Sequence, residues 1–508
     1  MTVEQLLNDG WQFCKLPLGS TLEDVSNAAL QAVDLPHDFL IENENDLYET
    51  TDAWYLRTLD VPESWCASCV LVRFDGVYMD CDVLLNGHVV CTHHYGYTAF
   101  DVDLTSRLLV GRNTLAVHIR HQSPNSRWYS GAGIYRDVTL HVLPKRHIPL
   151  DGVYVTTTHE LESWTMTIDT ELCGVKDNGV LTHVLLDGDV PVCDVTVEAA
   201  GDHANAVIQV LSPKLWSPDA PNVYTLQTML GSQVIRQNVG FRDLTFTTDR
   251  GLLVNGAPVK LHGVCLHHDL GCLGSAFHEK AMRRQLRAMR QMGVNALRTS
   301  HNPPAKQVMD LCDELGIFVV DEAFDMWLRA KTPFDYARFF PTDMPSDVAA
   351  WVRRDRNHPS LLMWSIGNEI LDTHLDESAQ QVTCDLCENV RLHDPRGNAV
   401  ITIGSNFMPW EGARKCADLV DAQGYNYGEK YYEAHHAEHP DWVIYGSETA
   451  SALSSRGIYH FPMAASILSA MLRAGQFHVQ LGHEGHAQVH RGRFEHAVFA
   501  GAVPLERD

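Results

Sequence analysis

The sequence has few basic residues and no long apolar run, and both absences exclude classes of function. The chain of 508 residues has 64 Asp and Glu but only 39 Lys and Arg, so its formal net charge is -25. This charge repels phosphate backbones and anionic lipids, so we expect neither nucleic acid nor membrane as a partner. No apolar run reaches the roughly 18 residues of a membrane helix, and "MTVEQLLNDGWQF" lacks the basic start and apolar block of a secretory signal. We therefore expect a cytoplasmic protein.

Signatures of metal and nucleotide binding are also scarce. The 13 cysteines are an odd number scattered along the chain, and the one close pair, in "CDLC" at 384–387, stands alone. Neither a zinc site nor a disulfide framework is favoured. No G-x-G-x-x-G opens a helix after the first strand of the second half, which argues against a dinucleotide-binding sheet. We predict no metal and no cofactor.

The first half of the chain is rich in strands. The length of the whole chain, 508 residues, predicts about three domains. Residues 1–145 contain alternating apolar and polar segments with an "NG" turn at Asn86 and Gly87, which predicts a β-sandwich. Residues 146–245 continue with short alternating strands and suit an immunoglobulin-like sandwich.

From about residue 246 short apolar strands alternate with amphipathic segments such as 278–293, a pattern typical of parallel β/α units. We predict seven strands of a (β/α)₈ TIM barrel in residues 246–463, at 259–264, 295–300, 317–323, 361–369, 399–404, 418–426 and 442–448. Polar or charged residues lie at the carboxyl ends of almost all these strands. In such a barrel the carboxyl ends of the strands form the active site.

Two glutamates at these strand ends suggest a reaction. Glu369 ends the apolar run "LLMWSIGNE" and Glu448 ends "WVIYGSE". Two carboxylates across one bowl are what the cleavage of a glycosidic bond requires, one to protonate the leaving oxygen and one to attack or to activate water. Either could instead cap the following helix.

The neighbouring strand ends carry further candidates. Arg298 could keep Glu448 ionised, or form a structural ion pair with Asp321 or Glu322, while an apolar surround would let Glu369 act as an acid. His267 and His301 suit hydrogen bonds to sugar hydroxyls, metal binding or a structural role. Four tryptophans are candidate sugar platforms, although any single one is more often core: Trp128, Trp327, Trp364 and Trp410.

Several motifs in order resemble one enzyme family over residues 10 to 463: "WYSGAGIYRDV", "NVGFRDLTF", "LLVNGAPVKLHGV", "NALRTSHNPP", "FVVDEAFDMW", "DRNHPSLLMWSIGNE" and "YGSETAS". Together they look like glycoside hydrolase family 2, the family of β-galactosidases and β-glucuronidases. The resemblance implies that the first sandwich is a jelly roll of the sugar-binding type, followed by the immunoglobulin-like sandwich and the TIM barrel. It also implies cleavage with retention of anomeric configuration.

The resemblance also implies roles for individual residues. Glu369 matches the family's acid/base and Glu448 its nucleophile. Asn368 matches the residue that bonds the sugar 2-hydroxyl, and Tyr427 the tyrosine beside the nucleophile. The other matches are pocket residues of the galactosidase branch and a residue of the loop that the first domain sends to the pocket: His267, His301, Arg298 and Asn125.

Two departures from the family pattern qualify the expected substrate. Where large bacterial galactosidases carry magnesium ligands, this chain has Met326 and Leu328, so we predict no such metal. Ser451 stands where those enzymes have a histidine. The Asn-x-Lys signature of the glucuronidases would fall in a region that this chain does not present.

The family likeness stops at residues 464–508, so we expect an incomplete barrel that lacks its eighth strand. A divergent C-terminal helix is one explanation. Another is a shifted reading frame, because the codons of Ala502 to Asp508, read one base later, can encode Gln-Phe-Leu-Trp-Ser-Gly, which resembles the family's eighth strand.

The sequence therefore predicts a retaining exo-β-glycosidase that hydrolyses terminal β-D-galactosides, with a small carbohydrate as its partner and a homo-oligomer as a possible assembly. A β-glucuronidase or another family 2 exo-enzyme is the first alternative. An inactive, truncated carbohydrate-binding homologue is the second.

Overall fold

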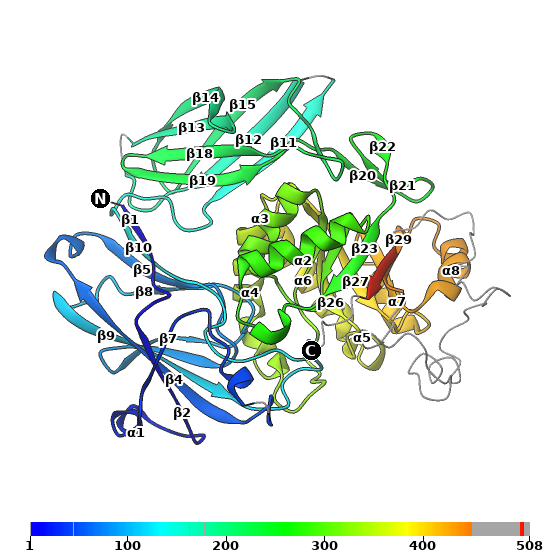
Figure 1. Ribbon diagram of the computed structural model, residues 1–508. Coiled ribbons are helices and arrows are strands. Elements are labelled where there is room, and N and C mark those ends of the chain that lie inside the picture. Colours follow the sequence, from blue (N-terminus) through cyan, green and yellow to red (C-terminus); the bar gives the residue numbers. More distant parts are fainter. Residues whose placement is uncertain (1, 44, 162, 177–178, 450–497, 502–508) are drawn as a thin grey trace.

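The computed structural model describes residues 2–43, 45–161, 163–176, 179–449 and 498–501. They form three bodies, with a barrel flanked by two β-sandwiches (Figure 1). The predicted fold class is confirmed. Within the described part of the chain, no helix has the length and apolar character needed to cross a membrane.

The first sandwich packs two antiparallel sheets face to face. One sheet has the order β1 (Val3–Leu6), β10 (Val138–Leu143), β5 (Cys69–Phe74) and β8 (Phe100–Asp103). The other has the order β3 (Gln31–Val33), β2 (Trp11–Leu16), β4 (Thr51–Val61), β9 (Gly111–His121), β6 (Cys81–Leu85) and β7 (His88–His93). Asn86 and Gly87, both at positive φ, make the tight turn between β6 and β7, as predicted. A short helix, α1 (Leu22–Ser26), lies at its edge.

The second sandwich shows the expected alternation most clearly. Along β15 every second residue is buried, because successive side chains of a strand point to opposite faces. One sheet contains β11 (Val153–Glu160), β12 (Ser163–Glu171) and β15 (His203–Leu211); the other contains β14 (Val190–Ala199), β13 (Gly179–Asp187), β18 (Tyr224–Leu230) and β19 (Gln233–Val239). A small sheet of β20 (Leu244–Thr247), β21 (Gly251–Val254) and β22 (Ala257–Pro258) leads into the barrel.

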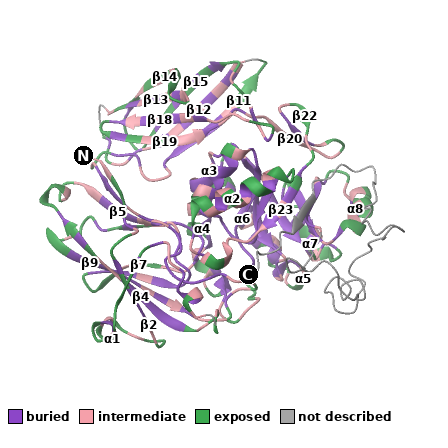
Figure 2. Ribbon diagram, viewed as in Figure 1, coloured by how far each residue is buried: buried purple, intermediate pink, exposed green. Residues whose placement is uncertain are grey.

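The barrel is a ring of parallel strands with helices outside. The strands are β23 (His262–Leu266), β24 (Ala296–Thr299), β25 (Phe318–Glu322), β26 (Leu361–Asn368), β27 (Val400–Ser405), β28 (Ala422–Asn426), β29 (Ile444–Glu448) and β30 (Val498–Gly501). The helices are α2 (Glu279–Gln291), α3 (Lys306–Leu315), α4 (Phe340–Asp355), α5 (Asp372–Leu375), α6 (Ala379–His393), α7 (Glu411–Ala417) and α8 (Tyr432–Glu438). Figure 2 shows the buried residues concentrated in this ring. Every residue of β26 is buried, as expected of a strand covered on both faces.

The closure of the ring differs from the sequence expectation. We expected the eighth position to be empty, but β30 pairs in parallel with β23 at four positions and with β29 at one, Gly446 with Val498. Four residues of the tail itself fill the gap, because any extended backbone can supply partners to the exposed edge of β23. The rest of the tail, at 464–497 and 502–508, lies outside the described residues, and so does Ser451.

The first sandwich and the barrel share one continuous core. Tyr78, Tyr95, Tyr97 and Tyr135 of the sandwich pack in the same buried cluster as the barrel helices and strands. The carboxylate of Asp38 joins the two bodies, since it accepts hydrogen bonds from the backbone nitrogen of Ser275 at 2.8 Å and from Tyr129 at 2.6 Å. A loop of the sandwich can therefore be held at a fixed place over the barrel.

Candidate active site

The carboxyl ends of the barrel strands carry a single connected network of polar side chains. Arg298 is the last residue but one of β24. The others are the last residues of their strands: Glu322 of β25, Asn368 of β26, Asn426 of β28 and Glu448 of β29. Each is hydrogen-bonded to at least one other member of the set. Because parallel strands all end at the same rim, residues up to 150 positions apart in the chain meet here.

Arg298 is the centre of this network and is fully buried. Its Nη1 donates to Oε1 of Glu448 at 2.8 Å, its Nη2 donates to Oδ1 of Asn368 at 2.8 Å, and Nε and Nη2 hold both oxygens of Glu322 at 2.8 to 3.0 Å. The two alternatives considered for Arg298 are therefore both present, because one guanidinium has five N–H groups. Gly404 leaves room for it, since a Cβ there would lie 3.0 Å from Nη2.

Glu448 is held as a carboxylate. Its Oε1 faces Arg298, and its Oε2 accepts the hydroxyl of Tyr427 at 2.5 Å. Burial by itself would favour the neutral form, but the charges of Arg298 and His301 and the two hydrogen bonds outweigh it, so that the pKa of Glu448 falls to about 2. The predicted pairing of Arg298 with Glu448 is confirmed.

Glu369 lies one residue beyond β26, where the chain turns. Its φ of 46° is in the left-handed region, which costs a non-glycine residue on the order of 1 kcal/mol or more. Its backbone nitrogen donates to the carbonyl of Gly404 at 2.8 Å, which fixes the turn. Tyr427, at the corresponding turn after β28, has a similar φ of 53°. Both turns direct a candidate site residue into the bowl instead of continuing the strand.

The surroundings of Glu369 correct one expectation. We expected an apolar surround, but Oε1 accepts a hydrogen bond from Nδ2 of Asn426 at 3.2 Å and Oε2 accepts one from Nη1 of Arg127 at 3.2 Å. The expectation failed because neither partner belongs to the run "LLMWSIGNE". Asn426 also donates to Oδ1 of Asn368 at 2.9 Å, and through Asn368 and Arg298 the two glutamates belong to one hydrogen-bond network.

Three charged residues beside Glu369 escaped the sequence analysis. Arg127, from the first sandwich, forms a two-point bond with Asp325, at 2.6 and 3.0 Å. Lys331 donates to Asp325 at 2.9 Å and to the carbonyl of Asn368 at 2.8 Å. Burial by itself would raise the pKa of Asp325. Lys331 and Arg127 have the larger, opposite effect, so the pKa of Asp325 lies well below its usual range. The available signal was the charge of Asp325 inside the otherwise apolar "AFDMW".

The two histidines lie together beneath Trp128. The ring centroids of His267 and His301 are 5.3 Å apart, and each is 5.3 Å from the ring of Trp128. Nδ1 of His301 bonds Glu322 at 2.8 Å, and its Nε2 lies 3.8 Å from Oε1 of Glu448. Burial, followed by the proximity of His301, lowers the pKa of His267 to about 3, so His267 is neutral. Neutral imidazole can both donate to and accept from sugar hydroxyls.

Asn125 serves its own loop more than the bowl. Its Nδ2 donates to the carbonyl of Gln122 at 2.7 Å and bonds Nε2 of His121 at 3.0 Å, while its Oδ1 accepts from Tyr78 at 3.0 Å. Asn125 and His301 both line a cavity of about 20 Å³. The contact between this loop and Glu369 comes from Arg127, two residues further on.

The four tryptophans that were candidates for stacking on a sugar differ in their exposure to solvent. Trp327 and Trp364 are fully buried, and their indole nitrogens donate to the carbonyl of Ile366 and to Asp394. These two belong to the core and cannot stack on a sugar. Trp128 borders the bowl, and Trp410 is 58% exposed on the rim.

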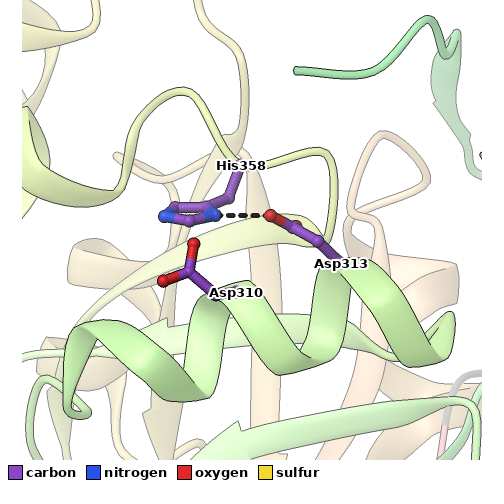
Figure 3. Close-up of side chains that lie close together, drawn as sticks. All are labelled: Asp310, Asp313 and His358. Carbon is purple, nitrogen blue, oxygen red and sulfur yellow. Dashed lines mark hydrogen bonds and ion pairs between the residues drawn. The ribbon is translucent and has the colours of Figure 1, made fainter. Parts of the chain in front are cut away.

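One cluster in the described residues has the composition of a metal site. Asp310 and Asp313 of α3 and His358 bring ligand atoms within 4.8 Å of one another (Figure 3). Their atoms already have partners: His358 Nδ1 bonds Asp313 at 2.6 Å, and Lys306 donates to Asp310 at 2.9 Å. The ammonium of Lys306 supplies the positive charge that a cation would bring, so the cluster is explained as structural. At the places where magnesium ligands were considered, Met326 and Leu328 offer no oxygen or nitrogen donor in their side chains.

Each of the three domains matches a model of a known protein family. Residues 4–144 match the sugar-binding domain of glycosyl hydrolases family 2, residues 147–242 match the model described as glycosyl hydrolases family 2, and residues 246–397 match that family's TIM barrel domain. The chain belongs to glycoside hydrolase family 2. The family named from the sequence motifs is thereby confirmed.

Individual family 2 relatives differ in the sugar that their names specify. "Beta-galactosidase BoGH2A" of Bacteroides ovatus is 34% identical over 493 residues, which cover 85% of this chain and 57% of that protein. A "Putative beta-glucuronidase" of Formosa agariphila is 32% identical over 400 residues, covering 75% and 38%. A crystal structure of a family 2 member from Bacteroides cellulosilyticus superposes with a TM-score of 0.81 at 31% identity, covering 88% of this chain and 61% of that one. The chain thus spans 38% to 61% of the length of these three relatives.

Proposed function

We propose that this protein is a retaining exo-β-glycosidase that hydrolyses terminal β-D-galactosides, with Glu448 as the nucleophile and Glu369 as the acid/base. The observation that carries the proposal is the unequal treatment of the two glutamates. Glu448 is fixed as an anion by Arg298 and Tyr427, whereas Glu369 lies at the end of a strained turn and, among the described residues, is held by two longer bonds. Two carboxyl groups in different environments are the usual basis for separate nucleophile and acid roles.

The proposed reaction has two steps. In the first, a carboxylate oxygen of Glu448 attacks the anomeric carbon while the carboxyl proton of Glu369 passes to the departing glycosidic oxygen, so that a glycosyl ester forms on Glu448 and the aglycone leaves as an alcohol. In the second, Glu369, now a carboxylate, takes a proton from water as the water oxygen attacks the anomeric carbon. The ester bond breaks and Glu448 is regenerated.

The neighbouring residues support this division of labour. Tyr427 and Arg298 each bind one oxygen of Glu448 and orient it for attack. Asn368 uses its Oδ1 for Arg298 and Asn426 and one amide hydrogen for Asp325, which leaves its second amide hydrogen for a sugar hydroxyl. Neutral His267 offers an uncharged bond to a further hydroxyl.

The test compares nitrophenyl β-D-galactoside with nitrophenyl β-D-glucuronide, using the wild type and Glu448→Gln. We expect turnover of the galactoside, little turnover of the glucuronide, and a loss of at least about a thousandfold in kcat for Glu448→Gln. Preferential turnover of the glucuronide would favour the activity named for the Formosa relative. Binding of galactose without any turnover would favour an inactive carbohydrate-binding protein.

A further inference from the structure

A partly exposed aromatic cluster lies on the rim of the barrel outside the residues discussed for the reaction. It consists of Trp410, Phe407 and His374. The imidazole of His374 stacks on Phe407 with ring centroids 3.8 Å apart and an interplanar angle of 28°, and its centroid lies 5.8 Å from that of Trp410. Trp410 is 58% exposed, whereas the tryptophans of the barrel strands are buried. A large, exposed indole beside the stacked pair of His374 and Phe407 therefore offers apolar surface to solvent.

The cluster is built as a rigid platform. The backbone nitrogen of Trp410 donates to the carbonyl of Phe407 at 2.8 Å, and that of Phe407 donates to the hydroxyl of Ser405 at 3.0 Å. Arg414 of α7 donates to two further carbonyls of the segment, those of Met408 and Pro409, at 3.1 and 3.0 Å. The segment 406–410 is therefore tied at both ends, and a ligand that stacks on it loses little loop entropy.

The segment is also pressed against the chain that follows Glu369. At Gly412, a Cβ would lie 2.5 Å from the carbonyl oxygen of Thr373, so only glycine allows α7 to approach α5 this closely. His374 belongs to α5, five residues after Glu369, and Glu369 itself bonds the backbone of Gly404, just before the platform segment. The platform segment thus follows β27, the strand beside β26 and Glu369, whereas Glu448 closes β29, two strands further round the ring.

The chemistry of the reaction says which part of a substrate lies on that side. An acid that protonates the glycosidic oxygen must stand beside the leaving group, so the aglycone leaves past Glu369. Aromatic side chains bind the apolar faces of pyranose and aryl rings, and ring-on-ring contacts add to the burial of area. We propose that Trp410, supported by Phe407 and His374, is the platform on which a ring-bearing aglycone, a second pyranose or an aryl group, stacks. This assignment rests on the proposed function, with Glu369 as the acid.

The experiment measures kcat/KM for three substrates that share one glycone and differ in the aglycone: methyl, nitrophenyl, and a second pyranose. Trp410→Ala is expected to lower kcat/KM for the two ring-bearing substrates by roughly tenfold, mainly through KM, and to change the methyl glycoside less than twofold. Trp410→Phe should restore most of the loss. Leu392→Ala is the matched control, because Leu392 is similarly exposed, at 69%, at the far end of α6.

The outcomes separate the platform from the proposed function. Equal losses on all three substrates, or no loss on the ring-bearing ones while the wild type turns them over, would overturn the platform and leave the glycosidase assignment standing. Failure of the wild type to hydrolyse any of the three would overturn the proposed function, and the platform with it. Thermal unfolding of each variant shows that a lost activity is not a lost fold, since an exposed residue contributes little to stability.

Discussion

Replacing Tyr427 by phenylalanine removes one hydroxyl from the network and tests how Glu448 is kept ionised. The hydroxyl donates to Oε2 of Glu448 at 2.5 Å, and the pKa of that carboxyl is held at about 2 against the effect of burial. A hydrogen bond to a charged group contributes about 1.5–3 kcal/mol, and one pKa unit corresponds to about 1.4 kcal/mol. In Tyr427→Phe the pKa of Glu448 should therefore rise by about one to two units.

The assay is the pH dependence of kcat/KM, whose acid limb reports the ionisation of an essential base in the free enzyme. A nucleophile must be ionised, so a raised pKa moves the acid limb to higher pH. We expect the acid limb of the variant to lie about one to two pH units above that of the wild type. The variant should lose less kcat/KM at pH 7 than at acid pH, because Glu448 stays ionised in both proteins at pH 7. Far-UV circular dichroism at each pH separates this shift from acid unfolding.

Tyr425→Phe is the matched control. Tyr425 lies two residues earlier, within β28, and is fully buried, and its hydroxyl bonds His435 at 2.8 Å, away from Glu448. Its removal should leave the acid limb in place. The reasoning is refuted if Tyr427→Phe folds normally and keeps the wild-type limb, or if both variants shift it equally.

Three further predictions follow from individual carboxyl groups. Glu369→Ala should lower kcat/KM by about 10²–10⁴-fold for an alkyl glycoside but far less for a dinitrophenyl glycoside, whose leaving group needs no proton, and equal losses would exclude Glu369 as the acid. Asp38→Ala should lower the free energy of unfolding, measured in urea, by at least about 3 kcal/mol, because the buried donors of the sandwich and the barrel lose their shared acceptor. Asp38→Asn should lower it less, and equal losses for the two variants would contradict this. Burial raises the pKa of Asp347 to about 7, so the folded state is penalised increasingly as pH rises from about 4 to 7. Asp347→Asn should therefore raise the free energy of unfolding more at pH 8 than at pH 4, by up to about 4 kcal/mol, and a pH-independent difference would refute this account.

The barrel and its strand-end residues were accessible to sequence reasoning because each signal is local. An apolar run such as "LLMWSIGNE" reads as a buried strand, and a parallel barrel gathers all strand ends at one rim. That rule alone brings Arg298 and Glu448 together, and the structure places them 2.8 Å apart. It also indicates why Glu322 meets the same arginine.

The contacts of Glu369 were not accessible in the same way, because they depend on the docking of two domains. Arg127 lies in a loop of the first sandwich, and no periodicity says which of its residues will face the barrel. Asn125 was the natural candidate by resemblance, but a difference of two positions decides between bonding within the loop and reaching the bowl. The closure by β30 was missed for a related reason, since four extended residues carry no pattern of their own.

The most direct test of the central claim is to trap the glycosyl group on the protein. A 2-deoxy-2-fluoro-β-galactosyl substrate with an activated leaving group slows both steps, because the fluorine destabilises the electron-poor transition state, while the good leaving group keeps the first step the faster one. Peptide mass spectrometry should then find the fluorosugar esterified to Glu448, and no label in Glu448→Gln. A protein that hydrolyses the parent galactoside but carries the label on another residue, or carries none, would contradict the account.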